Sequence, residues 1–101
     1  MNNRTFQQIL NNRIRETKDT LGTKQAEYTK AGDRLHNFKV AARYDNEDPE
    51  RALWGILKKH LVSVQDLVND PSLVTDHLIT DKIGDSINYL ILLEALFRER
   101  M

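Results

Sequence analysis

Two aspartates near the C-terminal end of the chain have the type and spacing that could hold a metal ion. Asp81 and Asp85 are four residues apart, so in a helix their carboxylates stand one above the other on the same face. Such like charges repel each other unless something positive lies between them. Mg²⁺ suits this place, because it takes a few carboxylates, keeps several waters and bridges to phosphate oxygens. Asn88, one turn further on, could add a neutral oxygen ligand or bind an edge of a substrate. The alternative interpretation is that both aspartates are solvated residues of a first helical turn, favoured there by the positive helix N-terminus.

His60 and Lys59 are the second group that could take part in chemistry. His60 lies in the middle of an apolar stripe, which is typical of a core histidine bonded to a neighbour. The alternative is that His60 faces the acidic residues and contacts a phosphate or a base. Metal ligation by histidine together with carboxylates would favour Zn²⁺ or Mn²⁺ over Mg²⁺. Lys59 could neutralise phosphates, or it belongs to a solvated helix face.

The acidic pair begins the last predicted helix, which covers residues 81–98. Its second half is apolar almost all round, so we expect it to be buried among neighbouring helices. The two aspartates would then face a cleft between helices, because their stripe continues as core one turn later. Glu94 falls within an apolar stripe, and an unpaired carboxylate there would be costly. We therefore expect Glu94 to have a cationic or hydrogen-bonding partner.

Helical periodicity also covers most of the remaining chain. A first helix is predicted up to about residue 31; it is thin in apolar residues and kinked or broken at Gly22, and we expect it to dock on another subunit or fray. Gly32 and Asp33 indicate a helix stop followed by a helix start, and a short helix follows. The strongest prediction is a helix from Pro49 to about residue 69, whereas residues 72–80 form a short turn or the start of the last helix. The fold class predicted is all-α, a small bundle of three to five helices in one domain over residues 1–101.

Composition narrows the function classes. The chain has 101 residues, with 15 basic and 15 acidic side chains and no cysteine. Zero net charge and the lack of a basic stripe disfavour nucleic-acid binding, and the absence of cysteine excludes disulfides and thiolate metal sites. The N-terminus lacks the apolar core of a signal peptide, and no apolar run approaches the roughly 20 residues of a membrane span. We expect a cytoplasmic protein without a membrane segment.

Three stretches resemble known proteins. DKIGDSINYLILLEAL resembles the second acidic helix of the MazG-like all-α nucleoside triphosphate pyrophosphohydrolases. Together with KQAEYTKAGDRLHNF and ALWGILKKHLVSVQDLV, it also looks like small phage and prophage proteins, for which the location would be the host cytoplasm. The resemblance covers roughly residues 24 to 98. It implies an oligomeric helical bundle in which acidic residues hold Mg²⁺, or Mn²⁺, and a nucleotide is cleaved between its α and β phosphates.

The resemblance assigns roles to particular positions. Asp81 and Asp85 match the second metal motif, whereas the first motif, Glu-x-x-Glu on the preceding long helix, has no match. There the chain offers Lys59, His60 and Asp66 instead. The site could draw Glu27 or Asp33 from the junction between the first two helices, or it could have lost its metal. The substrate contacts that we predict lie in the junction and on the last helix: Tyr28, Asn37 and Asn88.

Three hypotheses follow for the function. In the first, the chain is a metal-dependent (deoxy)nucleotide pyrophosphohydrolase with Asp81, Asp85, His60 and Lys59 in its active site. In the second, the same bundle binds a nucleotide or a phage or host protein without turnover. In the third, it is a structural oligomer whose acidic face is solvated. A short chain that buries both faces of its helices needs a partner surface, so we expect a homodimer or homotetramer.

Overall fold

The computed structural model describes residues 1–23 and 32–101, and each regular element within them is helical. Two residues assigned to the predicted site, Glu27 and Tyr28, lie outside this part of the chain. The prediction of a small all-α fold is confirmed. The helices are α1 (Asn3–Thr23), α3 (His36–Tyr44), α4 (Pro49–Asn69), the short α5 (Asp76–Leu78) and α6 (Gly84–Arg100), with a 3₁₀ turn η1 at Pro71–Leu73 and a π-helical turn η2 at Ile79–Ile83.

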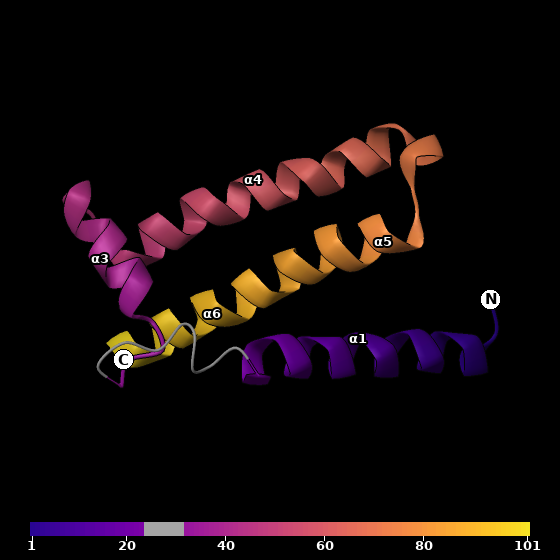
Figure 1. Cartoon of the computed structure of the whole chain (residues 1–101), viewed down its shortest axis with the longest axis horizontal. Helices are drawn as coiled ribbons and strands as arrows, with labels where there is room; N and C mark the ends of the chain where they lie inside the picture. The colour runs from indigo at the N-terminus through magenta and orange to yellow at the C-terminus, as the bar shows by residue number, and fades with distance from the viewer. Residues whose placement is uncertain (24–31) are drawn as a thin grey trace.

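An antiparallel hairpin of α4 and α6 forms the centre of the molecule, with α3 packed across the start of α4 and α1 along the other side of α6 (Figure 1). Its core is small, because four leucines from three segments make up the buried cluster: Leu35, Leu53, Leu57 and Leu96. Phe38 and Tyr89 pack against this cluster and meet edge to face, with ring centroids 6.5 Å apart. Leu53 and Leu57 are fully buried, so the amphipathic α4 supplies the centre of the core.

The predicted start and end of α4 agree with the structure. Asp48 is the N-cap residue, and Pro49 occupies the first helical position, where its missing N–H costs nothing. The corner that follows is closed by side chains that accept backbone hydrogen bonds, Asp70 from Ser72 and Thr75 from Leu78. Thr75 is thus the cap of the last helical segment. Each of the two alternatives for residues 72–80 holds for part of them, because Pro71–Leu73 form a separate short turn and residues 76–80 start the last segment.

The last helical segment contains a turn that the sequence did not predict. From Asp76 to Arg100 the chain stays helical, but Ile79–Ile83 form a π-helix between α5 and α6. A π turn bonds residue i to residue i+5 and is found most often as a single turn within an α-helix. Asp81 lies within this turn and Asp85 lies in the first turn of α6.

The expectation that the last helix is buried all round is wrong for the chain by itself. Leu90 and Phe97 are 49% and 51% exposed, and of the apolar side chains of α6 only Leu96 is buried. Glu94 is also exposed and lies outside the core. Its carboxylate accepts a hydrogen bond from Arg98 Nε at 2.6 Å, so it has a partner one turn along its own helix.

Helix α1 meets α6 at a close approach between Arg13 and Gly84. A Cβ atom at Gly84 would lie 2.6 Å from Arg13 Nη1, so the missing side chain of Gly84 makes room for the guanidinium. The helix continues through Gly22 and is described up to Thr23; the remainder of the predicted first helix lies outside the described residues. The N-terminal half of α1 leaves Phe6 and Ile9 about half exposed, at 56% and 49%.

Candidate functional site

Two adjoining hollows lie between α1 and α6. The first, which we call the carboxylate hollow, has a volume of about 350 Å³. Four of its side chains are acidic, two from α1 and two from the π turn and the start of α6. Its lining consists of Arg13, Glu16, Asp19, Thr20, Thr80, Asp81, Gly84, Asp85 and Asn88.

The second hollow, which we call the amide hollow, has a volume of about 340 Å³ and a more apolar lining. It is bounded by α1, α3, α4 and α6. Its lining consists of Thr20, Leu21, Arg34, Asn37, Phe38, Ile56, Asp85, Asn88, Tyr89 and Leu92. Thr20, Asp85 and Asn88 line both hollows, so the two adjoin; we call them together the groove, which has an acidic end and an aromatic and amide end.

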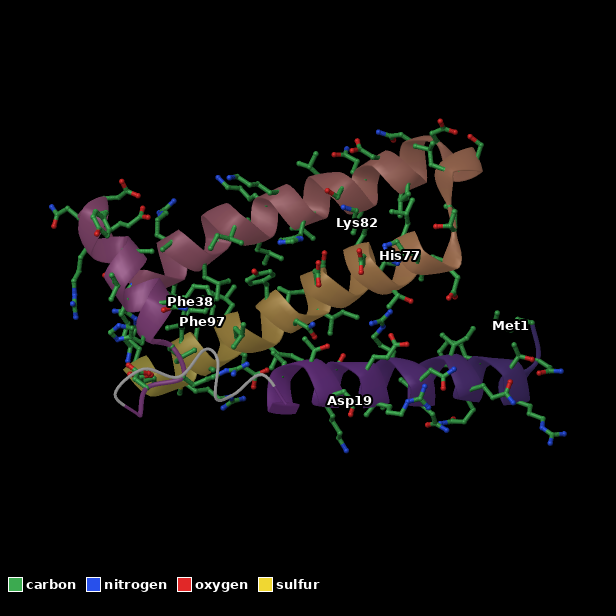
Figure 2. The ribbon with its side chains drawn as sticks, viewed as in Figure 1. Met1, Asp19, Phe38, His77, Lys82 and Phe97 are labelled. Carbon is green, nitrogen blue, oxygen red and sulfur yellow. The ribbon has the colours of Figure 1, made fainter. Side chains whose placement is uncertain are left out.

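Asp81 and Asp85 face this groove, as the sequence predicted, and are half exposed. The exposed fractions of their side chains are 51% and 49%. Each has a histidine nearby: Asp81 Oδ2 lies 3.3 Å from His77 Nε2, and Asp85 Oδ2 lies 3.8 Å from His60 Nδ1. His77, near the start of the last helical segment (Figure 2), is 80% exposed, so its contact with Asp81 is on the surface.

His60 lies beside the groove and meets α6 at two points. Its ring stacks on Tyr89 with centroids 4.9 Å apart and planes 27° from parallel. The ring therefore packs as a core histidine would, and its Nδ1 edge points to Asp85 at the acidic end. Both alternatives raised for His60 contain part of the observed arrangement, because the ring is packed while one nitrogen faces a carboxylate.

Asn88 is the predicted substrate residue that the structure places most centrally. Its side-chain oxygen Oδ1 is buried and has no hydrogen-bond partner within the described residues. A buried acceptor without a partner is costly, on the order of 1–3 kcal/mol. Since Asn88 lines both hollows, a ligand donor or cation in the groove would satisfy this oxygen.

The structure places other predicted site residues elsewhere. Asn37, for which we predicted a substrate contact, lies in the lining of the amide hollow. Lys59 is exposed on α4 and is not among the lining residues of either hollow. Asp33 instead binds Lys39 Nζ at 2.7 Å and accepts a hydrogen bond from the Leu35 N–H at 2.9 Å. The N-cap residue of α3 is Leu35 and not Asp33, so the predicted cap lies two residues too early, and the Asp33 carboxylate is taken up by these contacts.

Sequence reasoning missed two acidic residues of the groove, Glu16 and Asp19. They are three residues apart, which places them on one side of α1, and both line the carboxylate hollow opposite Asp81 and Asp85. A Glu-x-x-Asp spacing on the first helix was the available signal. It was overlooked because the thin apolar pattern of that helix indicated a docking or fraying segment.

The donors in the groove are of the type that a hard cation prefers. Carboxylate and amide oxygens are the ligands that Mg²⁺ takes, and Asn88 Oδ1 is a buried oxygen without a partner. In residues 1–23 and 32–101, however, no three histidine, cysteine or acidic side chains lie close enough together to hold a metal ion by themselves. The chemistry of the lining therefore fits Mg²⁺, with further ligands to come from water or phosphate.

No family model, curated protein or solved structure matches this chain. Within the part of the chain that the structure describes, none of the helices has the length and apolar character needed to cross a membrane. The groove itself is therefore the basis for assigning a function.

Proposed function

We propose that the chain binds a nucleotide together with Mg²⁺ in the groove between α1 and α6 and cleaves it between its α and β phosphates, as a MazG-like pyrophosphohydrolase does. One observation supports this proposal above the others: the carboxylate hollow and the amide hollow adjoin and share Asp85 and Asn88. A nucleotide has the same division into a charged phosphate end and a flat, hydrogen-bonding base.

The base would lie in the amide hollow. Phe38 and Tyr89 offer aromatic surface there, and Asn37 and Asn88 offer amide groups that can both donate and accept hydrogen bonds. Binding the base at this end directs the phosphates towards Asp85 and the carboxylate hollow. The volume of each hollow, near 350 Å³, is at the lower end for small-molecule sites, so the ligand needs both.

At the acidic end, the carboxylates would share the cation and Arg13 would contact a phosphate oxygen. The cation, when bound, offsets phosphate charge and makes water a better nucleophile at neutral pH. Asp81 in the π turn and Asp85 at the start of α6 are the side chains that would hold it, with the remaining ligands from water and phosphate, because Glu16 pairs with Arg13 Nη1 at 3.3 Å. Water then attacks the α-phosphorus, the bond to the bridging oxygen breaks, pyrophosphate leaves, and the proton of the water passes to a carboxylate of the groove. His60 is the histidine nearest this carboxylate, with its Nδ1 3.8 Å from Asp85 Oδ2, beyond hydrogen-bond distance.

The test is a panel of nucleoside and deoxynucleoside triphosphates with Mg²⁺ or Mn²⁺, with pyrophosphate release as the readout. We expect turnover of at least one nucleotide and a loss of about 100-fold or more in Asp85→Asn, because this carboxylate belongs to both hollows. The matched control is Asp66→Asn, an exposed aspartate on α4 outside the groove, which should keep the wild-type rate. Turnover that survives Asp85→Asn would contradict the assignment of the site.

A second function, binding without turnover, is favoured by the lack of a three-residue metal cluster in the described residues. Thermal unfolding with and without nucleotide separates the two. A higher midpoint with nucleotide and Mg²⁺, but no pyrophosphate, would indicate a binding module. An unchanged midpoint and no product would contradict both and leave the structural oligomer.

A further inference from the structure

The outer side of the α4–α6 hairpin carries an apolar surface that the chain leaves exposed. Three residues on each helix recur at intervals of seven: Trp54, Leu61 and Val68 on α4, and Ile83, Leu90 and Phe97 on the last helical segment. Their exposed fractions run from 38% for Leu61 and Ile83 to 71% for Val68. We call these six residues the outer stripe. A repeat of seven is the spacing at which helices pack side by side in bundles and coiled coils.

The outer stripe lies on the side of the hairpin away from the groove. Leu61 follows His60, which points to Asp85, and so lies about 100° further round α4. Leu90 is two residues from both Asn88 and Leu92, which line the groove, so it lies about 160° from each of them round α6. The stripe and the groove are therefore different surfaces of the same two helices.

The six residues of the outer stripe pair into three layers across the hairpin. Glu50 binds Arg100 and His60 stacks on Tyr89, which fixes the antiparallel register of α4 and α6. In that register Trp54 lies level with Phe97, Leu61 with Leu90, and Val68 with Ile83. Each helix thus presents a row of large apolar side chains, and the two rows lie side by side along the hairpin.

We propose that a second copy of this chain covers the outer stripe, so that two α4–α6 hairpins pack face to face as a four-helix bundle with two-fold symmetry. The surface area of the chain supports a partner of this size. The accessible surface is 7552 Å², whereas a compact monomer of 11.8 kDa exposes about 5,900 Å². The excess, roughly 1,600 Å², is about twice what a standard interface takes from each partner.

The elongated shape and the charge agree with a second copy as the occupant. The radius of gyration is 15.6 Å, against about 13 Å for a compact chain of this length. The formal net charge is zero, so two copies approach without net repulsion. The charged pair at the edge of the stripe, Glu94 with Arg98, is neutral as a pair and can remain solvated at the rim.

The test measures the mass of the full chain by light scattering at micromolar concentration, for the wild type and two variants. We expect a dimer for the wild type and a monomer for Leu90→Glu, whose helical circular dichroism should be kept because Leu90 is already 49% exposed. Ile9→Glu is the matched control, since Ile9 has the same exposed fraction but lies on α1. A monomeric wild type, or a dimer lost in Ile9→Glu and kept in Leu90→Glu, would overturn the proposal.

Cross-linking tests the same interface without a new charge. The chain has no cysteine, so single Leu61→Cys and Leu90→Cys variants carry the only thiols. Leu61 and Leu90 form the middle layer of the outer stripe. For either direction of the two-fold axis, this layer lies opposite the same layer of the second copy. Oxidation should therefore give disulfide-linked dimers. If the two-fold axis runs perpendicular to the helices, each position faces the same position of the second copy, and each variant forms disulfides with itself. If the axis runs parallel to the helices, position 61 faces position 90, and disulfides form only when the Leu61→Cys and Leu90→Cys variants are mixed. No linked dimer in any of the three samples would also overturn the proposal, and neither outcome depends on nucleotide binding.

Discussion

At the scale of single residues, Asp33 and Lys39 show how the chain closes the start of α3. Lys39 Nζ donates to Asp33 Oδ2 and also binds Glu99, which ties α3 to the end of α6. The hydrogen bond from Lys39 is the main cause that lowers the pKa of Asp33 from its usual 3.8, and the hydrogen bond from the Leu35 N–H acts in the same direction. Near the start of α4, the hydrogen bond from the Arg100 guanidinium likewise lowers the pKa of Glu50.

These lowered pKa values predict an acid limb in stability. Because the folded pKa of Asp33 lies below the unfolded one, its contribution is fully present above about pH 4 and is lost as the pH falls through the folded pKa. We expect urea unfolding between about pH 5 and pH 2 to show this loss, and Asp33→Asn to have a flatter dependence on pH over the same interval. Asp66→Asn, which changes an exposed carboxylate on α4, serves as the control. An equal slope in both variants would contradict the role given to Asp33.

At the scale of the elements, the position of α1 depends on its contact with α6 at Gly84. Gly84 has ordinary helical dihedral angles, φ −59° and ψ −48°, so its backbone does not require glycine. What an added methyl group meets is Arg13 Nη1 at 2.6 Å, the far end of a flexible side chain. The cost of the contact is therefore small, whereas alanine in a helix is favoured over glycine by about 1 kcal/mol.

We expect Gly84→Ala to raise the free energy of unfolding by about 0.5–1 kcal/mol, as measured by urea unfolding. The guanidinium of Arg13 should move within the carboxylate hollow, so nucleotide affinity should fall while stability rises. Arg13→Lys is the companion variant, because it replaces the guanidinium that the added methyl group would displace by a shorter side chain, while Gly84 is unchanged. A loss of more than about 1 kcal/mol in Gly84→Ala would mean that Arg13 is fixed in its position.

The sequence predicted the helices well where their ends carry strong signals. Pro49 with Asp48 before it gave the start of α4 that the structure has, whereas the last helical segment begins at Asp76, five residues before the predicted start at residue 81. The π turn at Ile79–Ile83 has no comparable signal, because its residues have the same apolar spacing as an α-helix over so short a length. For the site, Asp81, Asp85 and Asn88 were predicted from their spacing. For Glu16 the only local signal was its spacing from Asp19, and its place in the groove depends on the packing of α1 on α6.

At the scale of the whole molecule, the core is small, so stability depends on what covers the apolar side chains that the core does not bury. Leu53 and Leu57 are fully buried, but large apolar side chains on all three long helices are not. The two proposed functions of the hairpin surfaces are separate in space, with a ligand on the groove side and a second copy on the outer stripe. The groove can therefore be tested in a monomeric variant such as Leu90→Glu.

If the dimer contributes to stability, the thermal midpoint depends on protein concentration by mass action. We expect the midpoint of the wild type to rise over a hundredfold increase in concentration, measured by circular dichroism, while that of Leu90→Glu stays constant. Added salt should lower the midpoint little, because an apolar interface is not screened as ion pairs are. A wild-type midpoint that does not change with concentration would contradict a dimer that forms as the chain folds.

The π turn at Ile79–Ile83 has a consequence for the direction of side chains along residues 76–100. One residue more than an α-helical turn holds is accommodated there, so every side chain before the turn is out of phase with α6 by about 100°. The corner at Thr75, which joins α4, is therefore turned by about 100° relative to Asp85 from where an unbroken α-helix over the same residues would place it.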